Sequence, residues 1–466
     1  MVDRPITDVS EIIESQKLSR FIIQLVIVSW IVTFFDGFDM NVIAFVAPDL
    51  ATSLHLNRLM LGNVFSAGLA GTMIGGFLFG YLGDRFGRRP SIILATASFG
   101  VLTLGLALPM GYVALLWLRL VQGVAIGGML PLCWALNIEY VPRSYQATVV
   151  TLIMLGYSFG VSFAGPLTIW LTPRYGWRSV FVFGGCAALL ATVLLIRRLP
   201  ESIKFLANQD KRPDLIARLA QRLAPGRTIG VTDRFVISDE IGKANRSFSV
   251  SLLFRDELRW ITPLLWTAYI ASSIAVFFGV SWTPAVLQML GFSRATAALA
   301  ASANSIGGAI AGLLLMRFTD TRGAISIAAL PVLTVPMLIV MGLASLGGPQ
   351  FIVLDFFSTM FLVGAHFGLH SVAGIFYPSS YRANGAGWAT SIAKIGSIMG
   401  PIIGGLTLSS RLPVKATFAL MAVCPFIVGI CMFIVGRLQI RMAREAGRKH
   451  WETPLPSLAT DAGVPD

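Results

Sequence analysis

Charged residues are scarce in this sequence. Asp, Glu, Lys and Arg make up only 13% of its 466 residues, whereas they make up about 25% of a typical soluble domain. So few charged side chains could not cover the surface of a water-soluble fold that is 55% hydrophobic. The composition therefore excludes a soluble globular protein and a disordered chain, and it indicates an integral membrane protein.

Cysteine is also rare, and no catalytic pattern is present. The sequence lacks a phosphate-binding loop and a nucleophile–base–acid set, and its polar segments are too short for a signalling output domain. The cysteines lie in apolar stretches without the spacing of a disulfide framework or a metal site; they are Cys133, Cys186, Cys424 and Cys431. We therefore expect neither an enzyme nor a sensor, and no metal or cofactor.

The net charge of +13 would suggest nucleic-acid binding in a soluble protein. Here the Lys and Arg residues gather in loops between apolar runs, where the positive-inside rule of membrane topology accounts for them. They are concentrated on the side that includes both termini, and the first apolar run is too long for a signal-peptide core. We therefore expect no nucleic-acid partner, a retained first span and two cytoplasmic termini.

Twelve apolar runs are long enough to cross a hydrocarbon core of about 30 Å, which takes about 20 helical residues. The predicted spans form two sets of six: 21–47, 58–80, 90–110, 113–138, 146–171 and 177–197, then 261–284, 295–317, 324–346, 350–377, 384–408 and 414–436. The predicted fold is thus all-α, with twelve transmembrane helices. Its predicted parts are two six-helix halves (1–197 and 261–436), a cytoplasmic central loop (198–260) and a cytoplasmic tail (437–466). In the central loop, an amphipathic segment near 215–223 predicts a surface helix.

The two halves resemble each other at a fixed offset. Residues 142–147, which follow span 4, share four of six residues with 378–383, which follow span 10, and the two segments are 236 positions apart. Asp84, after span 2, recurs at the same offset as Asp320, after span 8. This agreement predicts an internal duplication. In transporters built from parallel repeats, the substrate site lies between the halves near the bilayer midplane.

The loop after span 2 reads GYLGDRFGRR from Gly80 to Arg89 and closely resembles the signature loop of the major facilitator superfamily. Its glycines permit a tight turn, Asp84 suits a helix N-terminus, and its arginines can bond carboxylates, Glu139 among them. The alternative is an ordinary positively charged loop. We expect a conformational latch on the cytoplasmic face, formed by Gly80, Gly83, Asp84, Arg85, Gly87, Arg88, Arg89, Glu139, Asp320, Arg322 and Arg382.

The first span contains two carboxylates in the segment Asp36-Gly37-Phe38-Asp39. A charged residue inside a spanning helix costs about 2.5–3.5 kcal/mol on insertion scales, and residues i and i+3 share a helix face. The pair must therefore face a cavity or a cation, and mutual repulsion favours proton uptake by one member. The alternative is a structural pair held by a neighbouring arginine. The segment is similar to the first-span motif of the aromatic acid:proton symporter family.

In span 4, Arg119 begins an Arg-x-x-Gln-Gly pattern, which resembles the superfamily pattern linked to proton coupling. A permanently charged arginine in the membrane requires a carboxylate or an anionic ligand. We expect its partner to be Asp36, Asp39 or the substrate. Asp36, Asp39 and Arg119 are therefore the predicted proton-coupling residues.

Polar residues in later spans are candidates for substrate contact. His366 and His370 share a face of span 10, either as a relay or hydrogen-bond pair, as metal ligands, or as packing residues. Lys394 lies about 15 Å into span 11 and suits capture of a carboxylate, although the symporter family usually has Arg there. Tyr269 in span 7 could bond a phenolic hydroxyl. The predicted substrate-binding residues are Asp39, Asn41, Arg119, Tyr269, His366, His370 and Lys394.

The resemblance extends over essentially the whole chain. It implies a bacterial inner-membrane protein that functions as a monomer in the lipid bilayer and imports an aromatic or related organic carboxylate together with protons, by alternating access. The alternative is proton-coupled efflux, because Gly396, Gly400 and Gly405 lie in a segment that looks like a drug-antiporter motif. The sequence leaves open which carboxylate is carried and how many protons accompany it.

Overall fold

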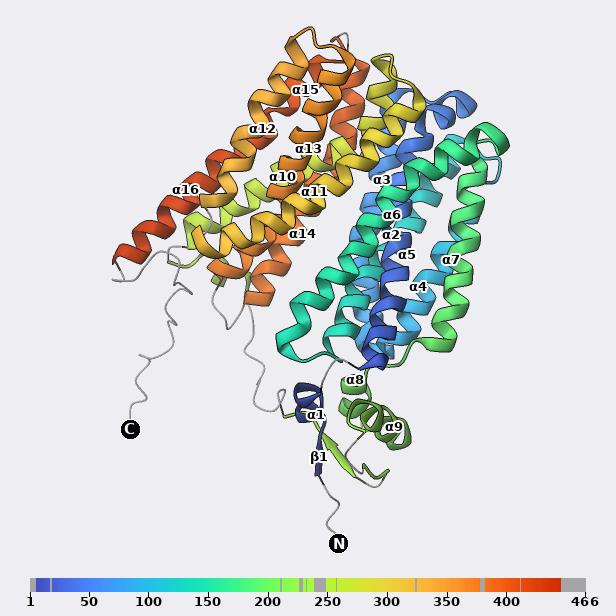
Figure 1. Ribbon diagram of the computed structural model, residues 1–466, viewed down its shortest axis with the longest axis vertical. Helices are drawn as coiled ribbons and strands as arrows, with labels where there is room; N and C mark the ends of the chain where they lie inside the picture. Colours follow the sequence, from blue (N-terminus) through green and yellow to red (C-terminus); the bar gives the residue numbers. More distant parts are fainter. Residues whose placement is uncertain are drawn as a thin grey trace. The chain divides into compact units, whose positions relative to one another are not determined.

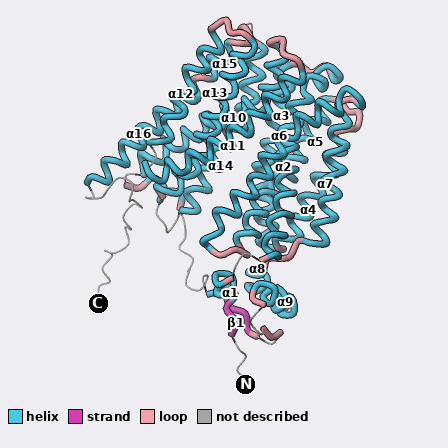
Figure 2. The backbone as a smooth tube through the Cα atoms, in the orientation of Figure 1, coloured by secondary structure: helices cyan, strands magenta, loops and turns pink. Residues whose placement is uncertain are grey.

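The protein is almost entirely helical in the computed structural model (Figure 1). Within the part of the chain that the structure describes, strand is found in one small region that includes the amino-terminal segment (Figure 2). The structure describes residues 6–16, 19–209, 212–225, 229–231, 233–238, 249–256, 258–322, 325–377, 382–410 and 412–445.

Twelve helices of the described chain have 18 or more residues, and each overlaps one predicted span. In chain order the first six are α2 (Arg20–Leu54), α3 (Arg58–Phe86), α4 (Arg88–Gly105), α5 (Tyr112–Ile138), α6 (Arg143–Tyr175) and α7 (Arg178–Arg198). The second six are α10 (Leu258–Met289), α11 (Arg294–Arg322), α12 (Ile325–Leu343), α13 (Gly348–Phe376), α14 (Arg382–Ser409) and α16 (Val423–Glu445), with the short α15 (Ala416–Met421) before the last.

The helices have the length and apolarity that a bilayer requires. Nine candidate spans are found among the described residues, and α12 contributes a shorter apolar helix. The two remaining long helices are more polar for identifiable reasons: α4 has 18 residues and begins with two arginines, and α11 is rich in Ala, Ser and Gly. The predicted all-α, multi-pass membrane fold is confirmed.

The helices pack into two compact units. The first unit comprises residues 1–42 and 70–246, and the second comprises residues 43–69 and 247–466. The end of α2 and the beginning of α3 thus pack within the second unit. The predicted boundaries of the two halves and the central loop remain predictions.

Polar contacts help to hold the 43–69 segment in the second unit. Asp49 of α2 forms an ion pair with Arg294 at the start of α11, with Oδ2 and Nη2 2.5 Å apart. Ser66 of α3 donates a hydrogen bond of 2.7 Å to the carbonyl oxygen of Ile398 in α14. A side-chain hydroxyl can reach a helix carbonyl in this way only where two helices lie close together.

In the first unit, glycines bring α2 and α6 into backbone contact. A Cβ on Gly37 would overlap the carbonyl oxygen of Tyr157, and a Cβ on Gly160 would overlap that of Phe34. Neither neighbour is a flexible side chain that could move aside. Gly37, which separates the two carboxylates of the first span, is therefore required for helix packing.

The amino-terminal segment and part of the central loop form a small folded module beyond one end of the first-unit helices (Figure 1). Its elements are β1 (Ile6–Asp8), α1 (Val9–Ser15), α8 (Ile203–Asn208), α9 (Pro213–Leu223) and β2 (Arg234–Val236), and a 3-10 helix, η2 (Val250–Phe254), precedes α10 in the second unit. β1 and β2 pair in parallel, with Ile6 opposite Arg234 and Asp8 opposite Val236.

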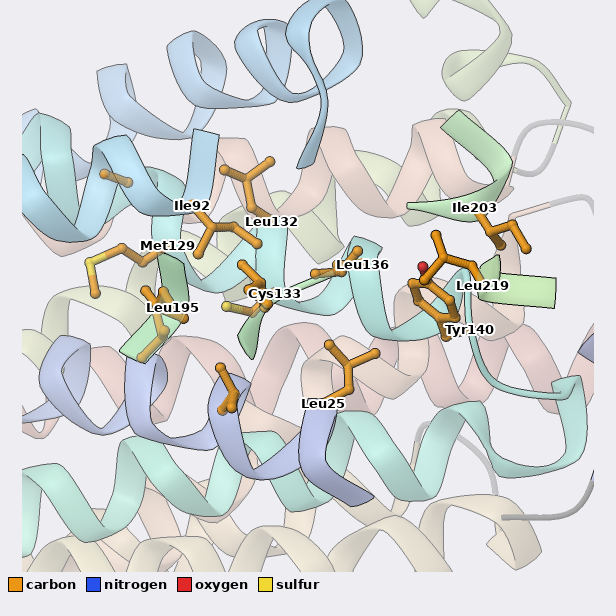
Figure 3. Close-up of a cluster of buried hydrophobic side chains, with 14 of the residues drawn as sticks. Leu25, Ile92, Met129, Leu132, Cys133, Leu136, Tyr140, Leu195, Ile203 and Leu219 are labelled. Carbon is orange, nitrogen blue, oxygen red and sulfur yellow. The ribbon is translucent and has the colours of Figure 1, made fainter. Parts of the chain in front are cut away.

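This module shares its apolar core with the helices. Figure 3 shows buried side chains that extend from the helical bundle into α8 and α9, namely Leu25, Ile92, Met129, Leu132, Cys133, Leu136, Tyr140, Leu195, Ile203 and Leu219. The predicted helix near 215–223 is confirmed as α9. Its apolar face is buried against the rest of the module, because Ile216, Leu219 and Leu223 are at most 4% exposed.

Candidate functional site

A buried polar network lies in the apolar interior of the first unit. Asp39 of α2 is fully buried and Arg119 of α5 is 2% exposed, and Arg119 Nη1 donates to Asp39 Oδ2 over 3.0 Å. Gln122, one turn after Arg119, donates from Nε2 to Asp39 Oδ1 (2.8 Å) and to Thr103 Oγ1 of α4 (2.7 Å). The network therefore links α2, α4 and α5.

Within the network, both carboxylate oxygens of Asp39 accept hydrogen bonds, but one N–H group of the Arg119 guanidinium does not donate to a described residue. Both oxygens of Asp39 accept a hydrogen bond, and Arg119 Nη1 also donates to Gln122 Oε1 over 2.6 Å. Among the described residues, the buried Nε of Arg119 has no hydrogen-bond partner. A buried donor without a partner is costly, so this arginine has capacity for another acceptor.

Asp36 and Asn41 lie near the network on the same helix. Asp36 is buried and interacts electrostatically with Cys133 of α5 and Tyr157 of α6. Asn41 is 5% exposed and donates from Nδ2 to the carbonyl oxygen of Gly37 over 3.0 Å. Of the two predicted carboxylates, Asp39 forms the ion pair with Arg119.

Gln122 and Thr103 were missed by the sequence analysis. Gln122 is part of the quoted Arg-x-x-Gln-Gly pattern, so its position was visible, but nothing local indicated that it would reach α2 and α4. Thr103 is an ordinary residue of an apolar run. Thr103 reaches the network because α4 packs against α5. The periodicity of apolar residues in the sequence does not predict which helices pack together.

The second unit contains the other predicted substrate residues. Ser272 Oγ of α10 lies 3.0 Å from His366 Nδ1 of α13, at hydrogen-bond distance. Tyr269 is fully buried and donates its hydroxyl to the carbonyl oxygen of Leu369 over 2.9 Å. Lys394 is half-buried in α14. His370 belongs to α13, but its side chain lies outside the described residues, and the roles of these residues remain predictions.

The signature loop forms a second polar cluster, centred on Arg88. This side chain forms ion pairs with Asp84, one turn earlier, and with Glu139 at the end of α5, whose Oε1 lies 3.3 Å from Arg88 Nη2. The neighbouring Arg89 donates from Nη2 to the carbonyl oxygen of Ile196 over 2.7 Å. The expected pairing of Glu139 with this loop is therefore present.

Glu201, just after α7, is a member of this cluster that the sequence analysis missed. Its Oε1 accepts from the backbone N–H groups of Arg88 (2.9 Å), Arg89 (3.2 Å) and Ser202 (2.8 Å). A carboxylate is favoured there because the first N–H groups of α4 are otherwise unpaired and carry the positive end of the helix dipole. Gly87, with φ of 111°, turns the chain beside this carboxylate.

The remaining predicted latch residues lie outside the cluster of ion pairs around Arg88 and differ in their surroundings. Arg85 lies with its guanidinium carbon 5.8 Å from the ring centroid of Phe86. A Cβ on Gly83 would overlap Leu132, whereas a Cβ on Gly80 would meet no atom within 4 Å. The side chains of three others lie outside the described residues: Asp320, Arg322 and Arg382.

Glu201→Gln is expected to weaken the pH dependence of stability. Burial raises the pKa of Glu201, although the backbone N–H donors of Ser202, Arg89 and Arg88 oppose that shift. The folded protein thus holds this proton more tightly than the unfolded chain does. The free energy of unfolding should therefore fall as pH rises from the ordinary Glu pKa of about 4.3 to the raised pKa.

Thermal unfolding of detergent-solubilised protein across this pH range measures the effect. Gln retains the acceptor oxygen but does not titrate, so the variant should show a smaller loss of stability with rising pH. Glu14→Gln, which makes the same chemical change at a more exposed carboxylate of the same unit, is the matched control for expression and folding. An unchanged slope in Glu201→Gln would contradict the assignment.

Comparisons with known proteins identify the family. The model of the Major Facilitator Superfamily matches residues 29–381. The chain is 30% identical to the gallate transporter of Pseudomonas putida, over 94% of this chain and 97% of that protein. It is 29% identical to the 4-hydroxybenzoate transporter PcaK of Acinetobacter baylyi, over 92% of this chain and 94% of that protein.

Solved structures share the fold. An inward-facing, occupied bacterial homologue of the human lysosomal transporter Spinster matches with a TM-score of 0.68 and 16% identity, over 90% of this chain and 98% of that chain. A D-xylose-proton symporter matches with a TM-score of 0.64 and 18% identity, over 90% of this chain and 97% of that chain. The chain therefore belongs to the Major Facilitator Superfamily and is a multi-pass membrane transporter, not an enzyme.

Proposed function

We propose that this transporter imports an aromatic or related organic carboxylate together with protons across a bacterial inner membrane, by alternating access and as a monomer. Both termini, and with them the amino-terminal module, would lie in the cytoplasm. The observation that carries the proposal is the buried ion pair between Asp39 and Arg119. Relatives that span nearly the full chain and transport gallate or 4-hydroxybenzoate support the substrate class.

The Asp39–Arg119 pair offers a direct way to couple a proton to an anion. When Asp39 is ionised, it neutralises Arg119 and the network needs no further charge. When Asp39 takes up a proton, Arg119 remains charged in an apolar environment and requires another anion. Its Nε, which has no hydrogen-bond partner among the residues that the structure describes, is a donor that a substrate carboxylate could use, so proton binding and substrate binding stabilise each other. Asp36, one turn away, is the second proton-coupling candidate.

The second unit contains further candidates for substrate contact. Lys394 places a cation in the membrane interior, where it can bind the carboxylate. His366, oriented by Ser272, would contact the ring substituents together with His370. Tyr269, which is hydrogen-bonded to Leu369 of α13, would also contribute to substrate binding. Asn41, which is hydrogen-bonded to the backbone of the first span, would do so as well.

Proton coupling has a clear energetic role for such a substrate. Moving one negative charge inward against a potential of 100 mV costs about 2.3 kcal/mol. One accompanying proton cancels this cost, so a monoanionic carboxylate can then be accumulated by the pH gradient.

The signature-loop cluster would act as the conformational latch on the cytoplasmic face. Arg88 bridges α3, α4 and α5 through Asp84 and Glu139, and Glu201 ties the start of α4 to the segment after α7. If the first unit rearranges on that face, either these contacts must break or the helices that they link must move together. Asp320, Arg322 and Arg382 would form the equivalent cluster in the repeat.

The glycines that resemble a drug-antiporter motif have a packing explanation that does not require efflux. A Cβ on Gly396 would overlap the carbonyl oxygen of Ile270, and a Cβ on Gly400 would crowd that of Ile274. These glycines let α14 approach α10 closely. The observation therefore gives no preference to efflux over import.

Uptake into liposomes reconstituted with purified protein tests the proposal. An imposed pH gradient, acidic outside, should drive accumulation of labelled benzoate, 4-hydroxybenzoate or gallate, and a protonophore should abolish it. Addition of substrate without a gradient should make the external medium more alkaline. Absence of uptake for every aromatic carboxylate in the panel, or proton movement opposite to the substrate, would contradict the proposal.

A further inference from the structure

The second unit contains a buried carboxyl group that the scheme above does not use. Asp355 of α13 is 2% exposed, and Asn304 of α11 is 4% exposed. Asn304 Nδ2 donates to Asp355 Oδ2 over 2.8 Å. The two helices pack closely at this level, because a Cβ on Gly307 would crowd the ring of Phe356.

Asp355 differs from Asp39 in its partner. Asp39 has an arginine, whereas among the described residues the electrostatic partner of Asp355 is one neutral amide. A buried carboxylate without a cation costs several kcal/mol. This carboxyl therefore has a physical reason to bind a proton that a carboxylate paired with a cation lacks.

No ionisable side chain of the neighbouring helices lies at the level of Asp355 in the described part of the second unit. The helices packed against α13 are α10, α11, α12, α14 and, through the rings of Phe351 and Phe418, α15. Neither α12 nor α15 contains an ionisable residue, and Lys415 immediately precedes α15. The ionisable residues on α10, α11, α14 and α13 itself are Arg259, Tyr269, Arg294, Arg317, Asp320, Arg322, His366, His370, Arg382 and Lys394.

The helix rise separates the nearest of these groups from Asp355. His366 lies about 16 Å further along α13, and Arg294 lies about 15 Å from Asn304 along α11 and already pairs with Asp49. Lys394 is about 18 Å from the start of α14, whereas Asp355 is about 32 Å from the adjoining end of α13. The two therefore differ by about 14 Å in depth.

The amide partner suits both protonation states of the carboxyl. Its N–H can donate to the carboxylate, and its oxygen can accept from the O–H of the acid. An aspartate that served only as a hydrogen-bond acceptor could be replaced by asparagine without the cost of a buried ionisable group. Ionisable residues inside spanning helices are functional candidates for this reason.

We propose that Asp355 is a second proton-carrying residue of the transport cycle. It would bind a proton where it meets water on one side of the membrane, carry it in the dry setting beside Asn304, and release it on the other side. With one proton carried by the Asp36/Asp39 pair of the first span, each carboxylate monoanion would enter with two protons, and one net positive charge would move inward. This inference rests on the proposed function, because it concerns the stoichiometry of that cycle.

The ratio of protons to carboxylate in reconstituted liposomes tests the inference. For the wild type we expect two protons per labelled carboxylate and uptake driven by an inside-negative potential alone, set by valinomycin and potassium. Asp355→Asn should carry one proton and lose the response to the potential, while exchange of labelled for unlabelled substrate continues. Asp355→Glu, the matched control, should keep the wild-type ratio.

Other outcomes have separate meanings. Electroneutral uptake by the wild type with one proton would overturn the role of Asp355 but leave the proposed function intact. Potential-driven uptake that persists in Asp355→Asn would overturn it as well. Failure of the wild type to move any carboxylate would instead contradict the proposed function.

An infrared measurement tests the protonation of Asp355 without substrate. The wild type should show a carboxylic-acid carbonyl band that is absent from Asp355→Asn, and lack of that band at every pH at which the protein is folded would overturn the inference. If Asp355→Asn does not fold, the wild-type proton ratio and the spectrum of Asp355→Glu still decide the question.

Discussion

Asp39→Asn is expected to abolish proton-driven accumulation of substrate, with a decrease of at least about 100-fold in the initial rate. The asparagine retains the shape of the side chain but cannot release or take up a proton. It also leaves Arg119 charged and without its ionic partner in a buried site. Breaking one side of a buried pair costs about 3–5 kcal/mol, and 1.36 kcal/mol corresponds to a factor of ten.

The double variant separates coupling from folding. Arg119→Gln alone should lower the thermal stability of the solubilised protein, because it leaves the Asp39 carboxylate without a cation. Asp39→Asn combined with Arg119→Gln removes both charges, so stability should recover towards the wild type while proton-driven uptake remains lost. Recovery of uptake as well would mean that the pair has only a structural role.

The matched control for this experiment is Asp214→Asn. Asp214 is exposed in the first turn of α9, so the same chemical change there should leave uptake within the range of the wild type. A similar loss in both variants would indicate a general effect of the substitutions on expression or insertion.

Much of the fold could be predicted from the sequence because the bilayer imposes a simple length rule. Apolar runs predicted each of the long helices, since a spanning helix must satisfy its own backbone hydrogen bonds. The small parallel sheet was not predicted. Its strands have three residues each, and the pairing of Ile6 with Arg234 depends on residues far apart in the chain.

The candidate site was predicted in part for a related reason. Asp39 and Arg119 were identifiable because ionisable residues are conspicuous in an apolar run. The choice of Asp39 over Asp36 as the partner of Arg119 was not accessible, because it depends on how α2 rotates against α5 and α6. Gly37 contributes to that rotation through its contact with Tyr157, and this role is not visible in the motif itself.

Glu201 illustrates a second kind of omission. It lies in a polar segment that has no apolar periodicity, and a single glutamate there is unremarkable. Its function as a cap for α4 becomes apparent only when the start of α4 and the end of α7 lie together, as the hydrogen bonds to Arg88 and Arg89 show.

Lys394→Ala is expected to weaken binding of a monoanionic carboxylate by about 30-fold to 4,000-fold, because loss of one member of a desolvated charge pair costs about 2–5 kcal/mol. Lys394→Arg should retain most of the affinity, since it keeps the positive charge. Binding can be measured as substrate protection against thermal unfolding, which does not require transport. Lys415→Ala, just before α15, is the matched control and should bind as the wild type does.

The comparison of Ala and Arg at this position also tests the geometry of recognition. An ammonium group acts as a compact point charge, whereas a guanidinium binds a carboxylate through two parallel N–H donors. If Lys394 binds the carboxylate directly, Arg should also change the preference among substrates with different ring substituents, because its longer side chain shifts the ring in the site. Equal affinity of the Ala variant and the wild type for every carboxylate would show that Arg119, and not Lys394, provides the anion-binding charge.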